Sequence, residues 1–185
     1  MPGENDKGQP ALTDPESMTA EERDRWATHY TVLGERYRHN DQPELAIEAL
    51  RQAVELRGEA IDQYCLGVAY VENGQPDKAI APLRQAVELR GEAIDQDWLC
   101  FAYIRNGQPD KAIAPLQNAV ELRGDAIDQH CLGAAYIRNG QPDKAIEPLQ
   151  NAVELRGDNN DQSCLGAAYI RNGQPDKAIA PLQNA

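Results

Sequence analysis

The segment Gly74-Gln75-Pro76-Asp77-Lys78-Ala79-Ile80 decides the fold, because it recurs unchanged along the chain. Further copies begin at Gly107, Gly140 and Gly173, each 33 residues after the last, and Asp41-Gln42-Pro43 is a shorter copy one period earlier. A fixed period of this length is the signature of stacked structural repeats. We therefore divide the chain into units of residues 26–58, 59–91, 92–124, 125–157 and an incomplete 158–185.

Each unit contains the pattern of two helices. In the second unit, apolar residues recur at i, i+3 and i+4 before Asn73-Gly74, and a second such stripe follows Pro76. Asn and Gly tolerate the left-handed conformation that ends helices, and proline suits the first turn of the next helix. Gly91 is expected to end the second helix. The pattern predicts a helix, a tight turn and a second helix in every unit.

The helical stripes resemble the tetratricopeptide-repeat pattern across residues 26–185. The residues at the characteristic small and large positions of that family pattern are, in the second unit, Leu66-Gly67, Tyr70, Gly74, Ala79, Leu83 and Ala86. In the first unit they are Leu33, Gly34, Tyr37, Ala46, Leu50 and Ala53. The resemblance implies an all-α fold, a right-handed α-solenoid of antiparallel helix pairs. Ankyrin repeats share the period but require a Thr-Pro-Leu-His turn that the sequence lacks.

Three departures from the family pattern are visible. The family usually has about 34 residues per unit, one more than this chain. Gln63 and Gly91 stand where the family usually has a large aromatic residue and a proline, and Cys100 replaces the glycine of the other units. We expect these changes to alter superhelical pitch and local packing but not the architecture.

Composition and charge narrow the classes of partner and of cellular location that we expect. The chain is 41% hydrophobic and 26% charged, which is typical of a folded, soluble protein, and its formal charge of −12 disfavours nucleic acid as a partner. No apolar run approaches the ~20 residues that span a bilayer, and residues 1–17 do not have the pattern of a secretory signal. We expect a cytoplasmic protein with no membrane contact.

The sequence offers no arrangement typical of catalysis. His130 and Cys131 are neighbours, but adjacent residues on a helix point about 100° apart and do not face each other. Cys65, Cys131 and Cys164 occupy equivalent places in successive units, so layers roughly 8 to 10 Å apart separate them beyond the reach of zinc or a disulfide. We predict free, partly buried thiols, no catalytic residues, no metal and no cofactor.

Differences between copies concentrate on the first helix of each unit. Residues 106–129 and 139–162 differ at only three positions, so the positions that do vary stand out. The variable positions form three rows: Tyr64, Asp97, His130 and Ser163; Cys65, Trp98, Cys131 and Cys164; and Val68, Phe101, Ala134 and Ala167. The family resemblance implies that these rows line a concave groove. Trp98 and Phe101 are predicted to anchor a partner there, with core filling as the alternative for Trp98.

A fourth row lies near the end of each first helix and comprises Glu72, Arg105, Arg138 and Arg171. Three arginines at one-unit intervals can pair with carboxylates of an extended acidic ligand. A favourable interaction with the helix dipole is an equally good explanation for them. The lysine and asparagine residues with which some relatives clamp a C-terminal carboxylate are absent, since Thr31, Glu35, Tyr64 and Val68 occupy those places.

The two ends of the chain differ from the middle. Residues 1–17 are predicted to form a flexible acidic tail before an array spanning 18–185, and Thr19 with Glu22 has the spacing of a capping box that starts a helix. At the other end, Ile179 and Leu182 are expected to lie on an uncovered face, so either the chain is a fragment of a longer one or this end docks on another copy or domain.

These observations predict a non-catalytic scaffold that binds a protein or peptide in the concave groove. The alternatives are a self-assembling repeat module that stacks through its C-terminal end, and the recognition part of a larger bacterial sensor or effector system. The predicted partner-binding residues are Tyr64, Val68, Asp97, Trp98, Phe101, Arg105, His130, Arg138, Ser163 and Arg171.

Overall fold

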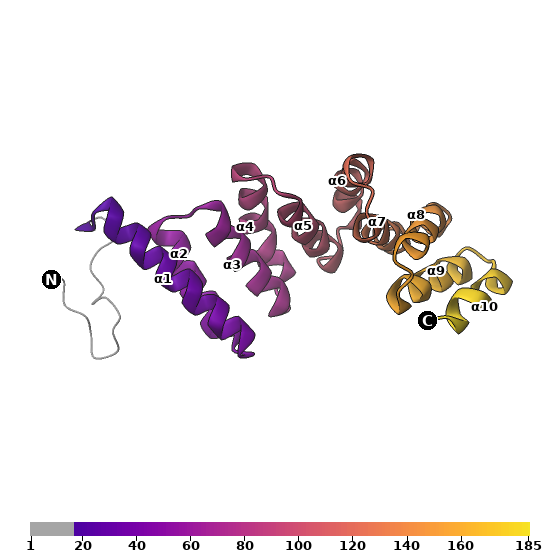
Figure 1. Ribbon diagram of the computed structural model, residues 1–185, viewed down its shortest axis with the longest axis horizontal. Coiled ribbons are helices and arrows are strands. Elements are labelled where there is room, and N and C mark those ends of the chain that lie inside the picture. The colour runs from indigo at the N-terminus through magenta and orange to yellow at the C-terminus, as the bar shows by residue number, and fades with distance from the viewer. Residues whose placement is uncertain (1–16) are drawn as a thin grey trace.

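The computed structural model describes residues 17–185, which form ten helices joined by short turns (Figure 1). The predicted tail lies outside these residues, except for Ser17. In chain order the helices are α1 (Ala20–His39), α2 (Pro43–Leu56), α3 (Ala60–Glu72), α4 (Pro76–Leu89), α5 (Ala93–Arg105), α6 (Pro109–Leu122), α7 (Ala126–Arg138), α8 (Pro142–Leu155), α9 (Asn159–Arg171) and α10 (Pro175–Gln183).

The helices follow one another along an elongated array, with α1 at one end and α10 at the other (Figure 1). Each helix packs on its neighbours in sequence, and each odd-numbered helix also contacts the next odd-numbered one. No contact as extensive joins successive even-numbered helices within residues 17–185. The odd-numbered helices are therefore more closely spaced, which places them on the inner side of the curve. The predicted solenoid of antiparallel helix pairs is confirmed.

Each unit is held together by small residues facing a buried leucine. Leu83 and its equivalents Leu50, Leu116 and Leu149 are almost completely buried. A Cβ atom added to Gly67 would lie 2.4 Å from Leu83 Cγ, so only glycine allows α3 to approach α4 this closely. In the third unit Cys100 occupies the glycine position, and α5 packs less extensively on α6 than α3 does on α4. This difference agrees with the expected change in local packing.

The turn after each odd-numbered helix is fixed by one glycine. At the end of α3 the Gly74 N–H donates to Val71 C=O and the Gln75 N–H to Tyr70 C=O, which is the Schellman pattern. Asn73 has φ −77°, whereas Gly74 has φ +69°, so only the glycine adopts the left-handed conformation. In the first unit Asp41 takes this role with φ +56°. The predicted helix stop is confirmed, with the correction that Asn73 remains right-handed.

The start of α1 matches its prediction. The Thr19 N–H donates to Glu22 Oε2 at 2.9 Å, and the Glu22 N–H donates to Thr19 Oγ1 at 3.2 Å, which closes a capping box. From there α1 runs without interruption through Trp26 into the first unit. None of the helices within residues 17–185 is long and apolar enough to cross a membrane.

Candidate functional site: a variable face on the odd-numbered helices

Three side chains of α5 form a continuous stack that we call the aromatic ladder: Trp98, Phe101 and Arg105. The rings of Trp98 and Phe101 meet edge to face with centroids 5.8 Å apart, and the Arg105 guanidinium lies 5.8 Å from the Phe101 centroid. Trp98 is partly buried against the core, whereas Phe101 is 40% exposed. Trp98 therefore fills space in the core, as the alternative interpretation expected, and it also supports the exposed ring of Phe101.

The predicted rows are not equally accessible. Cys131 and Ala134 on α7 are partly exposed, and so are Cys164 and Ala167 on α9, so small side chains continue the surface beside the aromatic ladder. Val68 is only 3% exposed, because α3 is covered by contacts with both α1 and α5. Val68 was expected to present its side chain to a partner, but that side chain is buried, so this part of the prediction is wrong. Ser163 on α9 is exposed.

The row of arginines begins at Arg105. The preceding member of the row, Glu72, forms an ion pair with Arg38 at 2.7 Å. Arg138 and Arg171 are exposed, and within residues 17–185 neither forms an ion pair or a side-chain hydrogen bond. The surface formed by the aromatic ladder, the small side chains of α7 and α9, and Arg138 and Arg171 is called the odd-helix face below.

Sequence reasoning missed a buried ion pair that joins each unit to the next, which we call the Arg–Asp clasp. The third residue of each odd-numbered helix from α3 onward is a completely buried aspartate. Its carboxylate accepts hydrogen bonds from Nε and Nη2 of the arginine that follows the preceding even-numbered helix. In the first clasp, Asp62 Oδ2 and Oδ1 accept from Arg57 Nε at 3.0 Å and Nη2 at 2.9 Å. The clasps are Arg57 with Asp62, Arg90 with Asp95, Arg123 with Asp128, and Arg156 with Asp161.

Residues at the first variable row, which belong to the same unit as the clasp arginine, also contact these clasps. Thr31 Oγ1 donates to Asp62 Oδ1 at 2.7 Å, and the Arg90 guanidinium lies 5.6 Å from the centroid of the Tyr64 ring. Asp97 accepts from Arg123 Nη2 at 2.9 Å. His130 Nδ1 lies 2.8 Å from Asp161 Oδ1. Of the predicted binding residues, His130 contacts the aspartate of the next unit directly, whereas Tyr64 and Asp97 contact the clasp arginine of their own unit.

A signal for the clasp is present in the sequence. Each aspartate follows its arginine by five residues, in every unit from Arg57-Gly58 onward, and a glycine always follows the arginine. Opposite charges kept at a fixed spacing across a linker indicate a pair that closes over that linker. The fixed glycine is explained by the positive φ of Gly58, Gly91, Gly124 and Gly157.

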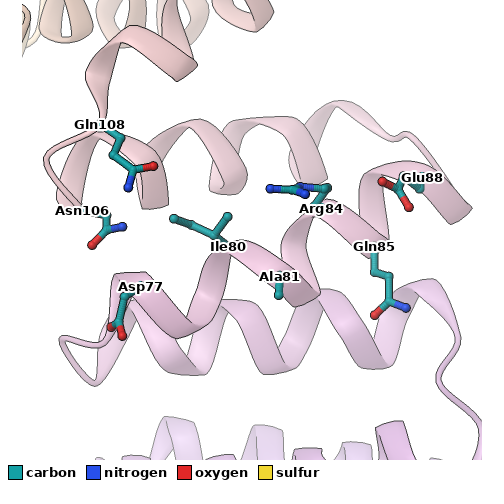
Figure 2. A pocket seen from close by; sticks show the side chains of 8 residues that line it. All are labelled: Asp77, Ile80, Ala81, Arg84, Gln85, Glu88, Asn106 and Gln108. Carbon is teal, nitrogen blue, oxygen red and sulfur yellow. The ribbon is translucent and has the colours of Figure 1, made fainter.

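Two hollows in the described surface lie away from the aromatic ladder. One of about 530 Å³ lies beside α4 and the turn between α5 and α6 (Figure 2). Its lining is mostly polar and includes Asp77, Arg84 and Glu88 of α4 with Asn106 and Gln108 of the turn, and none of the aromatic ladder. A second, of about 330 Å³, is lined by residues of α6, α7 and α8. Neither hollow includes a residue predicted to bind a partner.

Comparison with known proteins identifies the architecture. The tetratricopeptide-repeat family matches residues 31–94, and the anaphase-promoting complex subunit 5 family matches residues 99–139 and 132–171. A crystal structure of the MamA protein is 26% identical with a TM-score of 0.75, over 86% of this chain and 90% of that one. Nearly identical TPR-like repeats of a Podosopora anserina putative kinesin light chain are 27% identical with a TM-score of 0.74, over 88% and 93%. The chain is a tetratricopeptide-repeat protein.

More distant structures agree with this tetratricopeptide-repeat fold. MamA from Desulfovibrio magneticus RS-1 superimposes with a TM-score of 0.76 over 94% of both chains at 21% identity, which supports the fold alone. No curated protein sequence matches the chain. Tetratricopeptide-repeat proteins are typically protein–protein interaction scaffolds and are generally non-catalytic.

The thiols of this tetratricopeptide-repeat protein are free, as predicted. Burial raises the pKa of Cys65, Cys100 and Cys131 to about 12 and raises that of Cys164 to a smaller extent. Because the thiolate is the reactive form, these groups are weak nucleophiles at neutral pH. Within residues 17–185, no group of three or more His, Cys, Asp or Glu side chains is placed to hold a metal ion.

Proposed function

We propose that the chain is a protein-interaction module that holds a segment of a partner on its odd-helix face, with the aromatic ladder as the anchor. The observation that carries this proposal is the half-exposed aromatic stack on α5 in an array of otherwise near-identical units. Phe101 is the only phenylalanine in the sequence, and Trp98 is one of two tryptophans. The equivalent positions in the next unit hold Cys131 and Ala134.

The energetics of interfaces support this assignment. A few aromatic and arginine side chains carry most of the binding energy in protein complexes, and truncating one such residue typically costs about 2 kcal/mol or more. The aromatic ladder contains two aromatic side chains and one arginine in direct contact. The edge-to-face contact with Trp98 restricts the Phe101 ring before binding, which reduces the entropy lost when a partner covers it.

The test compares two double variants in a pull-down from the native lysate, with bound proteins quantified by mass spectrometry. Trp98→Ala with Phe101→Ala removes the anchor. Leu89→Ala with Leu122→Ala removes two exposed apolar side chains from the ends of α4 and α6, away from the odd-numbered helices, and serves as the matched control. A partner retained by the control and lost from the first variant supports the proposal; a partner retained by both contradicts it.

A second candidate function is self-association through α10. Ile179 and Leu182 are 55% and 45% exposed. Leu149, the equivalent of Leu182 in the fourth unit, is completely buried. A second copy packed on α10 would bury this apolar surface. Light scattering over a range of concentrations tests this candidate, and a monomer at every concentration rules it out.

A further inference from the structure

We propose that the segment held on the odd-helix face is acidic, and that its carboxylates pair with Arg105, Arg138 and Arg171. This inference rests on the proposed function, because it names the chemistry of the partner that the same face would hold. It goes beyond the anchor by assigning a charge and a spacing to the ligand.

The arginines at the C-terminal ends of helices α2 to α9 fall into two groups. Those at the ends of the even-numbered helices are engaged in the Arg–Asp clasps, and Arg38 is paired with Glu35 and Glu72. Arg138 and Arg171 have no such partner within the described part of the chain, and Arg105 contacts only the face of Phe101. The latter three guanidinium groups are therefore free to bind carboxylates from outside.

Arg138 lies at the end of α7, the helix that packs on α9. Its positive charge favours the thiolate of Cys164 on α9, although burial of that thiol dominates and raises its pKa. The exposed Arg138 and the partly exposed residues of α9 therefore lie on neighbouring helices of the same face.

Charge is distributed unequally between the two edges of the array. At the edge where odd-numbered helices end, the third unit carries two cations and one anion, namely Arg105, Lys111 and Asp110. The fourth and fifth units repeat this set. At the opposite edge the third unit carries one cation, the clasp arginine Arg123, with four anions: Glu92, Asp95, Asp97 and Glu121. The odd-helix face therefore borders a locally basic edge in a chain whose total charge is −12.

The repeat spacing limits the conformation of the ligand. Helix layers lie about 10 Å apart, so successive arginines of the row are separated by about that distance. A polyproline II segment has three residues per turn and rises about 3.1 Å per residue, which places every third side chain on one face about 9 Å apart. An acidic residue at every third position of such a segment matches the row, with an apolar residue next to Phe101.

The test measures the binding of three synthetic fluorescein-labelled peptides by anisotropy. Each has one leucine followed by three test residues at every third position in a proline-rich sequence; the test residues are glutamate, glutamine or lysine. We expect the glutamate peptide to bind about tenfold more tightly than the glutamine peptide at low salt, and the difference to shrink as salt is added. The lysine peptide should bind more weakly than both.

Variants locate the effect. Arg138→Gln with Arg171→Gln should weaken binding of the glutamate peptide by about fivefold to tenfold and leave the glutamine peptide unchanged. Arg51→Gln with Arg84→Gln removes the same charge from exposed positions on α2 and α4 and should have no effect. A glutamate peptide that binds no better than the glutamine peptide, or that does not respond to loss of Arg138 and Arg171, overturns the inference.

Two further outcomes separate this inference from the proposed function. If Trp98→Ala with Phe101→Ala loses the native partner while the peptides show no preference for glutamate, the face binds proteins but the acidic chemistry is wrong. A single-stranded oligonucleotide that binds more tightly than the glutamate peptide would also overturn the inference, because the arginines would then serve phosphate rather than carboxylate.

Discussion

His130 Nδ1 lies 2.8 Å from Asp161 Oδ1, although 31 residues separate the two in sequence. The same carboxylate accepts from Arg156 Nη2 at 2.7 Å and from Nε at 3.0 Å. One buried aspartate of the fifth unit is therefore contacted by a side chain of α7, His130, and by Arg156, which directly follows α8. Thr31 makes the corresponding contact with Asp62 of the next unit, whereas Tyr64 and Asp97 contact the clasp arginine of their own unit, so this row supports the junctions between units.

Loss of a clasp carboxylate should loosen one junction. Asp128 is completely buried and pairs with Arg123, so Asp128→Asn leaves a buried site without its charge. We expect a destabilisation of about 1–3 kcal/mol. The variant should accelerate amide hydrogen exchange more in α6 and α7 than in α1 and α2, because the stability of each unit depends on its nearest neighbours.

The control for that variant is Glu121→Gln, which removes an exposed carboxylate from the same edge. It should change the thermal midpoint little. Equal effects of the two variants would show that Asp128 contributes only its charge to the edge and not the buried pair.

Acid should open the junction of the fifth unit. Burial by itself would raise the pKa of Asp161, but the hydrogen bonds from Arg156 and His130 outweigh it and hold the pKa below its ordinary value. A carboxylate of depressed pKa stabilises the fold above its unfolded pKa of about 3.9, and that contribution is lost as pH falls through the folded value.

Circular dichroism and hydrogen exchange of α9 between pH 6 and acidic pH should therefore show a loss of stability below about pH 4. Asp161→Asn should already be less stable at neutral pH and should show a smaller further loss on acidification. An unchanged acid profile in Asp161→Asn would mean that other carboxylates govern this transition.

The four thiols should react slowly and in a fixed order. Cys65 and Cys100 are buried, Cys131 shares their pKa of about 12, and Cys164 is the least strongly shifted of the four. With a chromogenic disulfide reagent at pH 8, we expect Cys164 to react first. All four should react rapidly in concentrated urea, and rapid reaction of Cys65 or Cys100 in the native protein would contradict the packing described here.

Close packing of the helix pairs depends on glycine in four of the five units. A Cβ atom at Gly133 would lie 2.4 Å from Leu149 Cγ, so Gly133→Ala should destabilise the fourth unit by about 1–3 kcal/mol. Cys100→Ala, at the equivalent place in a unit that already holds a side chain, should be tolerated far better. Thermal unfolding of the two variants side by side checks this, and an equal shift of both would refute the role assigned to glycine.

Much of the fold could be predicted from local sequence. The helix stop at Asn73-Gly74, the proline at the start of α4 and the capping box at Thr19 each follow from backbone geometry that a few neighbouring residues determine. The period of 33 residues then fixed how many helix pairs follow one another.

The candidate site was harder to predict, because exposure depends on neighbouring units. Asp62 appears in the sequence as an acidic residue suited to a helix N-terminus, but it is buried by Arg57 and Thr31, which come from two different helices. Val68 and Phe101 occupy equivalent positions, yet only Phe101 is exposed. Spacing identifies the face to which a residue belongs but does not determine what covers that face.

The most direct test of the central claim uses Trp98 as its own reporter. Trp26→Phe leaves Trp98 as the only tryptophan and keeps an aromatic ring beside His29 and Tyr30. When the glutamate peptide is added to this variant, the account predicts that Trp98 emission shifts to shorter wavelength and is quenched less by acrylamide, in step with the rise in peptide anisotropy. Emission and quenching that stay constant while the anisotropy shows the peptide bound would place the binding site away from the aromatic ladder and contradict the account.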